Sequence, residues 1–175
     1  TKQSIEQTAY IEWLIKQAGV SELSFVLPAS MRDAKVAAPM ARKISRQPIN
    51  QNEGSAIRFT IELQDQILGD YRVLVQNDLP WSNAKATVPL VSEITGNVRH
   101  QFVTIENSGF DELVLDQPKG MQPLVRGDSY WNEFSKILGN TRVQAFRIDD
   151  AFNSDKPLND DGPRLSFGTR ARETV

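Results

Sequence analysis

The sequence predicts an α+β fold: a mostly antiparallel β-sheet or sandwich of about six or seven strands, flanked by an N-terminal helix and a second helix near 128–138. Three observations support this prediction: a strictly alternating apolar segment, a two-residue turn between two further alternating segments, and two segments with helical periodicity. The chain has 175 residues, enough to bury the core of one ordinary domain.

Residues 56–63 give the clearest strand signal, because every second side chain is apolar. A strand turns successive side chains to opposite faces, so this pattern predicts one buried face and one exposed face. We expect residues 64–70 to form a loop and residues 71–76 to return as the next strand. Shorter strands are expected at residues 23–27, 110–115 and 142–148.

A second hairpin is predicted around Gly96-Asn97, a dipeptide typical of the tight turns that join antiparallel strands. It would pair residues 87–95 with residues 98–106. In that register apolar residues face apolar residues, and Glu93 lies opposite His100.

Two helices are predicted from periodicity and capping residues. In residues 4–18, Ile5, Ala9 and Trp13 recur near the helical period, and Ser4 with Gln7 fits a capping box. Asp128 is expected to cap a helix that runs through Leu138. Each apolar stripe is interpreted as a face that packs on the sheet.

We expect one domain over residues 1–175, with two less regular parts. Residues 29–52 contain two prolines and two asparagines and are expected to form an irregular basic arm. Residues 149–175 are rich in Asn, Asp, Pro and Gly and are expected to form a polar tail, either mobile or laid over a neighbouring surface.

Composition excludes several kinds of chemistry. The chain has no Cys, which rules out disulfides and thiol nucleophiles, and one histidine, His100, which rules out zinc sites with several imidazoles. No apolar run reaches the roughly 18 residues of a membrane-spanning helix, so no membrane partner is expected. The N-terminus lacks a signal-peptide profile, which fits both cytoplasmic synthesis and a signal that has been removed.

The basic arm carries the strongest local charge bias, in a chain whose formal net charge is −2. Between residues 32 and 46 the only acid is Asp33, and the positive residues are Arg32, Lys35, Arg42, Lys43 and Arg46. The simpler interpretation of these charges is a solvated surface without a binding role. The sharper one is a site for nucleic acid or an acidic partner, without aromatic residues for base stacking.

Two other constellations are weaker. A carboxylate at Glu93 beside the imidazole of His100 resembles the start of a general base, yet such cross-strand pairs are common in sheets. The acidic stretch 149–162 suggests calcium, but Pro157 and Gly168 occupy positions where an EF-hand loop has acids. Because the EF-hand pattern fails, no metal is expected. No glycine-rich phosphate loop is present, so no nucleotide cofactor or other cofactor is expected.

The leading hypothesis is a non-enzymatic structural protein that self-assembles as a homo-oligomer, such as a viral coat or filament subunit assembled into a virion. Missing catalytic motifs and the pairing of a basic arm with an acidic body favour it. Two rivals remain: a small β-rich hydrolase or isomerase that uses Glu93 and His100, and a monomeric ligand-binding or adaptor module.

Overall fold

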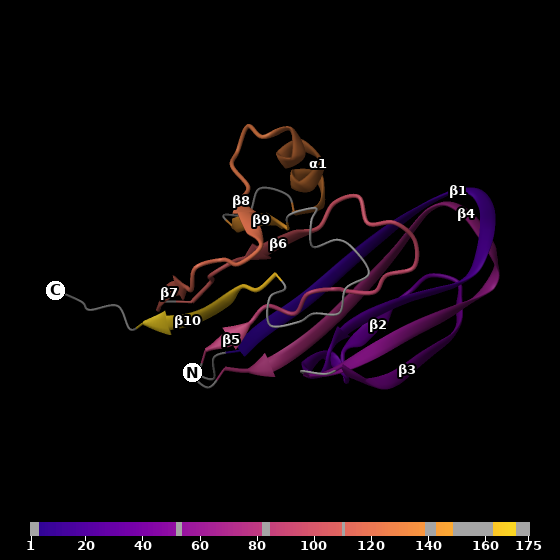
Figure 1. The fold of residues 1–175 in the computed structure, drawn as a ribbon, viewed down its shortest axis with the longest axis horizontal. Helices are drawn as coiled ribbons and strands as arrows, with labels where there is room; N and C mark the ends of the chain where they lie inside the picture. Colours follow the sequence, from indigo (N-terminus) through magenta and orange to yellow (C-terminus); the bar gives the residue numbers. More distant parts are fainter. Residues whose placement is uncertain are drawn as a thin grey trace. The chain divides into compact units, whose positions relative to one another are not determined.

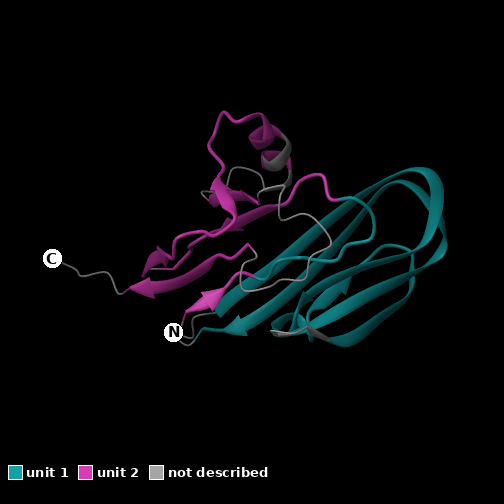
Figure 2. Cartoon of the chain, viewed as in Figure 1, with its two compact units in different colours: residues 1–82, 89–97 teal, residues 83–88, 98–175 magenta. Residues whose placement is uncertain are grey.

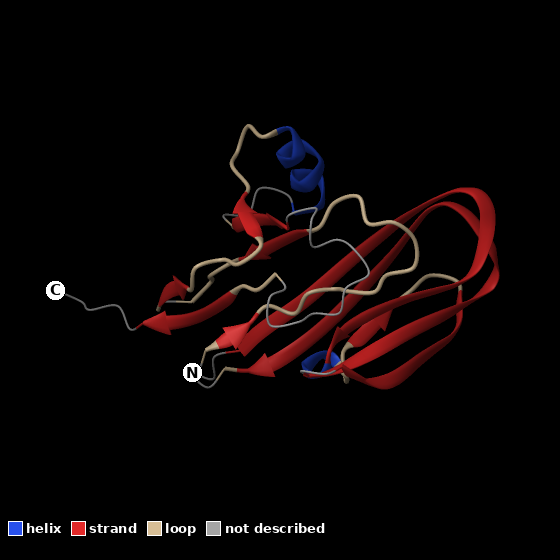
Figure 3. Cartoon of the chain, in the orientation of Figure 1, coloured by secondary structure: helices blue, strands red, loops and turns tan. Residues whose placement is uncertain are grey.

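The computed structural model describes residues 4–51, 54–81, 85–109, 111–138, 143–148 and 163–170. Within these ranges the chain forms ten strands in three antiparallel sheets and one short α-helix (Figures 1 and 3). The mostly antiparallel sheet is therefore confirmed, whereas the α+β class with an N-terminal helix and the count of about six or seven strands are wrong.

The chain divides into two compact units (Figure 2). Unit 1 comprises Thr1–Ser82 and Pro89–Asn97, and unit 2 comprises Asn83–Val88 and Val98–Val175. Each unit is described by itself below. The expectation of one domain over residues 1–175 stays a prediction.

Unit 1 is built on two very long strands, β1 (Ser4–Pro28) and β4 (Gly54–Pro80). They pair antiparallel from Ser4 opposite Pro80 to Pro28 opposite Ala56. On its other side β4 pairs with β3 (Ala41–Gln51) near its start and with the short β2 (Lys35–Ala37) near its end. A single 3-10 turn, η1 (Ala29–Met31), follows β1.

The β1–β4 ribbon bends back on itself (Figure 1), and its register shifts between Ile15 and Glu22. Two glycines suit this bend. Gly69 has a φ of 87°, which residues with a side chain rarely adopt, and a Cβ at Gly19 would lie only 2.9 Å from Cβ of Gln66. The bend turns one pair of strands into two layers.

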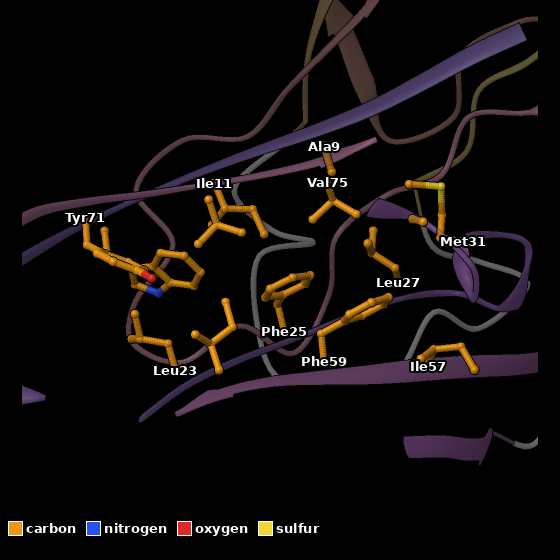
Figure 4. Close-up of a cluster of buried hydrophobic side chains, with 14 of the residues drawn as sticks. Ala9, Ile11, Leu23, Phe25, Leu27, Met31, Ile57, Phe59, Tyr71 and Val75 are labelled. Atoms are coloured by element: carbon orange, nitrogen blue, oxygen red, sulfur yellow. The ribbon is translucent and has the colours of Figure 1, made fainter. Parts of the chain in front are cut away.

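The core of unit 1 lies between these layers (Figure 4). Residues 9–13 and 71–75 supply one side, and residues 23–27 and 57–63 supply the other. The rings of Phe25 and Phe59, both fully buried, stack at 5.3 Å. The alternating pattern at residues 56–63 is thus confirmed as a strand with one buried face.

The helix expected at residues 4–18 is wrong, because this segment is the first half of β1. Ala9, Ile11 and Trp13 are buried, while the even-numbered residues between them are exposed. A spacing of four residues fits a strand as well as a helix, since four is a multiple of two. The pairing with residues 69–80, far along the chain, decides between them.

Two further expectations in unit 1 are wrong. Residues 64–70 are not a loop, since they belong to β4 and residues 71–76 continue the same strand. Residues 29–51 are not an irregular arm, because η1, β2 and β3 occupy most of that stretch. Both segments gain backbone partners from β1 or β4, which local sequence signals do not reveal.

Unit 2 has two small sheets and one helix. The first sheet joins β5 (Ala86–Thr87), β10 (Ser166–Arg170) and β7 (Glu112–Leu115), with β10 in the middle. The second joins β6 (Phe102–Ile105), β9 (Gln144–Ile148) and β8 (Met121–Pro123), with β9 in the middle. The helix is α1 (Ser129–Leu138).

Several predictions for unit 2 are confirmed. The helix near 128–138 is present as α1, and β7 and β9 fall inside the strands expected at 110–115 and 142–148. In the tail, β10 shows that residues 166–170 join a sheet. Residues 149–162, which carried the calcium interpretation, lie outside the described residues.

The hairpin around Gly96-Asn97 is wrong. Val26 and Ser92 exchange two backbone hydrogen bonds, of 2.8 and 2.9 Å, and the Thr95 amide donates to the Ser24 carbonyl. Residues 92–95 therefore lie along β1, while β6 pairs with β9. The Gly96-Asn97 signal reports only local turn preference. The two segments expected to form the hairpin pair instead with β1 and with β9.

Candidate functional site

The five basic residues of the expected arm lie in or beside three different elements of unit 1. Lys35 lies in β2, beside the end of β4, whereas Arg42, Lys43 and Arg46 lie in β3, beside its start. The two ends of β4 belong to different layers. Arg32 follows η1 and is exposed, as is Lys35.

Three of the five also have partners within unit 1. The carboxylate of Glu62 lies 3.0 Å from Arg42 and 3.7 Å from Lys43. The hydrogen bond from Arg42 lowers the pKa of Glu62 below its usual value. These contacts favour the interpretation of a solvated surface, and a nucleic-acid role stays a prediction.

Arg46 occupies an inward-facing position. It lies opposite Phe59 in the register, its guanidinium carbon is 5.6 Å from the centre of that ring, and it donates a 2.9 Å hydrogen bond to the Ala34 carbonyl. Phe59 and Ala34 are both buried. The cation thus covers the margin of the core, where cation–π attraction and a charged hydrogen bond hold it.

The expected Glu93–His100 pairing does not form, because its hairpin does not. The Glu93 carboxylate accepts a 2.6 Å hydrogen bond from Arg58 instead. In unit 2, the rings of His100 and Tyr130 pack edge to face with their centres 5.0 Å apart, and the guanidinium carbon of Arg147 lies 4.9 Å from the centre of the Tyr130 ring. These are packing contacts around α1, and the enzyme alternative stays a prediction.

Sheet edges are the remaining candidate, because an edge strand presents unpaired backbone N–H and C=O groups that can bind another strand. In unit 1 the second half of β1 is covered by residues 92–95. The β2 strand is only three residues long. Two long edges remain: the outer side of Ser4–Ile15, here called the β1 edge, and the outer side of Ala41–Gln51, here called the β3 edge.

The β3 edge carries the features by which proteins prevent edge-to-edge pairing. Pro48 has no N–H to donate, and the register of β3 shifts between Ala41 and Lys43. Arg46 is a charged residue at an inward-facing position. A second strand laid along β3 would meet all three obstacles.

The β1 edge carries none of these features. Its twelve residues pair with β4 in an unbroken register, from Ser4 opposite Pro80 to Ile15 opposite Gly69, and contain no proline or glycine. This is about twice the length of an average strand. Its inward-facing residues carry no charge, and among the described residues β4 is the only strand that pairs with it.

The outer face of the β1 edge is partly apolar. Tyr10 is 37% exposed and Leu14 is 51% exposed. Between them, Glu12 accepts 3.0 Å hydrogen bonds from the Tyr10 hydroxyl and from the Arg72 guanidinium of β4. Burial, followed by the hydrogen bond to Glu12, raises the pKa of Tyr10 above its usual value. Glu12 is therefore held on the exposed face of the sheet by one residue of β1 and one residue of β4.

Sequence reasoning missed this edge because it assigned residues 4–18 to a helix, which has no open edge. The odd-numbered residues from Ile5 to Ile15 are mostly apolar and the even-numbered residues mostly polar, and this alternation was a signal that could have found it. The absence of proline and of an inward charge from Ser4 to Ile15 would then have marked the strand as unprotected.

Other kinds of site find no support in the described part of the chain. No group of three or more histidine, aspartate or glutamate side chains there is placed to hold a metal ion. Among the same residues, no helix has the length and apolar character needed to cross a membrane. No protein-family model, curated protein or solved structure matches the chain.

Proposed function

We propose that this protein is a non-enzymatic structural protein that self-assembles, and that the β1 edge is its contact surface. The observation that carries the proposal is the contrast between the unprotected β1 edge and the protected β3 edge within the same sheet. An edge that is long, regular and without charge on its inner face is suited to receive another strand.

The energetics of strand addition support this use of the edge. Each backbone hydrogen bond formed at the edge contributes about 0.5–1.5 kcal/mol net. Tyr10 and Leu14 add apolar area that a second strand removes from water. Because the β1–β4 pairing already fixes the edge in its extended form, little further ordering of β1 is needed on association.

The proposal includes the role expected from the sequence, that of a subunit of a virion or filament. A subunit of such an assembly needs at least one surface that binds its own kind, and the β1 edge supplies a candidate. Cytoplasmic synthesis and assembly into a larger particle both remain part of that expectation.

Light scattering across a concentration series, at low and at high salt, tests the proposal. We expect the mass to rise with concentration from the 19.7 kDa of one chain toward at least twice that value. A mass of 19.7 kDa at every concentration and both salt levels would contradict self-assembly.

A further inference from the structure

We infer that the strand received by the β1 edge is the β1 edge of a second copy, antiparallel to the first, with Ile11 opposite Ile11. This inference rests on the proposed function and adds the partner and the register. It makes a dimer with twofold symmetry, in which β4–β1 of one copy continues into β1–β4 of the other.

The pattern of buried residues limits the possible registers. Shifting a strand by one residue moves all its side chains to the other face, so only registers that keep odd-numbered residues opposite odd-numbered residues leave both apolar faces on one side. In a twofold arrangement of this strand, such registers are those centred on a residue. The candidates near the middle of the edge are Ala9, Tyr10, Ile11 and Glu12.

Charge separates these four registers. Centring on Ala9 places Glu6 opposite Glu12, and centring on Glu12 places that carboxylate opposite its own copy. Both oppose like charges, which destabilises a pair of strands. Centring on Tyr10 places Glu6 opposite Leu14 and gains no charge pair. These assignments follow from the order of residues along β1.

Centring on Ile11 places Glu6 of each copy opposite Lys16 of the other, which is the β1 residue directly after the β1 edge, so the twofold axis produces two opposite-charge pairs. The same register sets the small Ala9 opposite the large Trp13, and Tyr10 opposite Glu12. No like charges meet at any position from Glu6 to Lys16.

The symmetry of this contact has a consequence for the assembly. Each copy uses the same edge, so the interface is isologous and closes after two copies. The β3 edge, with Pro48 and the inward Arg46, does not extend the sheet further. The dimer is therefore the building block, and any larger assembly must use other surfaces.

Charge exchange at Glu6 and Lys16 tests the register. Glu6→Lys and Lys16→Glu each replace two attractions across the axis by two repulsions, whereas the double variant restores both attractions with reversed signs. By sedimentation equilibrium we expect each single variant to dimerise roughly ten- to a hundredfold more weakly than the wild type. The double variant is expected to dimerise close to the wild type.

The variants suit this test because the folded chain tolerates them. Glu6 lies opposite Asp78 in the β1–β4 register, so a lysine there removes a like-charge pair within the monomer. Lys16 is exposed. Circular dichroism of each variant at low concentration checks that the fold is kept. Lys35→Glu in β2 makes the same charge change away from the edge and is expected to dimerise like the wild type.

The outcomes separate the register from the proposed function. Weakening by both single variants and recovery in the double variant support the Ile11 register. A wild-type dimer that neither single variant weakens, or that the double variant does not recover, overturns the register and leaves self-assembly standing. A wild type that stays monomeric overturns both.

Discussion

The β1 edge and the β3 edge belong to the same four-stranded sheet, and each pairs on one side with β4. They differ in what their outer sides offer to another chain. Along β3, a proline, a register shift and an inward arginine interrupt the row of backbone groups. Along β1, twelve residues keep an unbroken register with no such interruption.

This difference shows that protection of an edge is a local property, set residue by residue. Arg46 is an exposed residue whose guanidinium contacts the Phe59 ring and the Ala34 carbonyl, so it both covers the core and blocks the edge. No residue between Ser4 and Ile15 has such a double role. A monomer that only had to stay soluble would be expected to protect its longer edge as well.

The largest expected effect comes from placing lysines on the β1 edge. In the Ile11 register Thr8 faces Leu14 of the other copy, so Thr8→Lys with Leu14→Lys opposes two pairs of like charges. We expect light scattering to give 19.7 kDa at concentrations where the wild type is dimeric. Leu14 lies opposite Asp70 within the chain, so the new lysine gains a partner in the monomer.

Gln47→Lys with Gln64→Lys is the matched control, since it adds the same charge at exposed positions of β3 and β4. This variant should retain the wild-type mass. Equal loss of the dimer in both double variants would mean that total charge, and not the β1 edge, controls association.

The next effect comes from removing the protection of the β3 edge. Arg46→Leu with Pro48→Val takes away the inward cation and restores an N–H donor. We expect species heavier than the dimer, detected by size-exclusion chromatography with light scattering. Arg46→Lys keeps the charge and serves as the control. A mass equal to that of the wild type would show that these two residues do not prevent β3 from pairing with another chain.

A smaller effect is expected where stability changes without a change in association. Tyr71 lies in β4 opposite Trp13, and its hydroxyl donates a 2.7 Å hydrogen bond to the Pro39 carbonyl. Tyr71→Phe should lower the free energy of unfolding by about 0.5–1.5 kcal/mol in urea and leave dimerisation unchanged. A weaker dimer in this variant would show that association depends on the stability of the whole unit.

The same residue gives a pH dependence. Burial raises the pKa of Tyr71 above its usual value of 10.0. Because the folded state holds the proton more tightly than the unfolded state, this contribution to stability is present below that pH and is lost as the pH rises through the folded pKa. Between pH 10 and the folded pKa, the wild type should therefore lose stability more steeply than Tyr71→Phe.

The smallest effect is expected at the ion pair beside the β3 edge. Arg42→Gln removes the hydrogen bond that is the largest cause of the lowered pKa of Glu62. The pKa of Glu62 should return toward its usual value. NMR titration of the Glu62 side-chain carboxyl measures this change. The lowered pKa of Glu62 stabilises the fold above the usual carboxyl pKa, and this stabilisation is lost on acidification. Little change in overall stability is expected, because the Arg42 side chain is 69% exposed and that of Glu62 is 28% exposed, so solvent screens the pair. An unshifted pKa would assign the effect to Lys43 instead.

The sequence allowed the strand at residues 56–63 to be predicted because its alternation is strict and its buried face contains Phe59 and Ile61, both fully buried. The helix α1 was also predictable, from its capping residue and its period. Residues 4–15 were not, because their apolar residues satisfy both periods and the deciding partner lies more than fifty positions away in β4.

The candidate site depended on the same long-range pairing. The basic residues were conspicuous in the sequence, yet Arg46 faces inward, and Arg42 and Lys43 meet Glu62. The β1 edge carries little charge and no motif. Its character appears only when the outer side of β1 is compared with that of β3, which requires the order of strands in the sheet.

Hydrogen–deuterium exchange at two protein concentrations tests the central claim most directly, because it reports which backbone amides gain partners on association. We expect amides within residues 4–15 to exchange more slowly at the higher concentration, while those of residues 41–51 exchange at the same rate. Protection that appears along β3, or no change along β1 in a sample shown to be oligomeric, would contradict the assignment of the contact to the β1 edge.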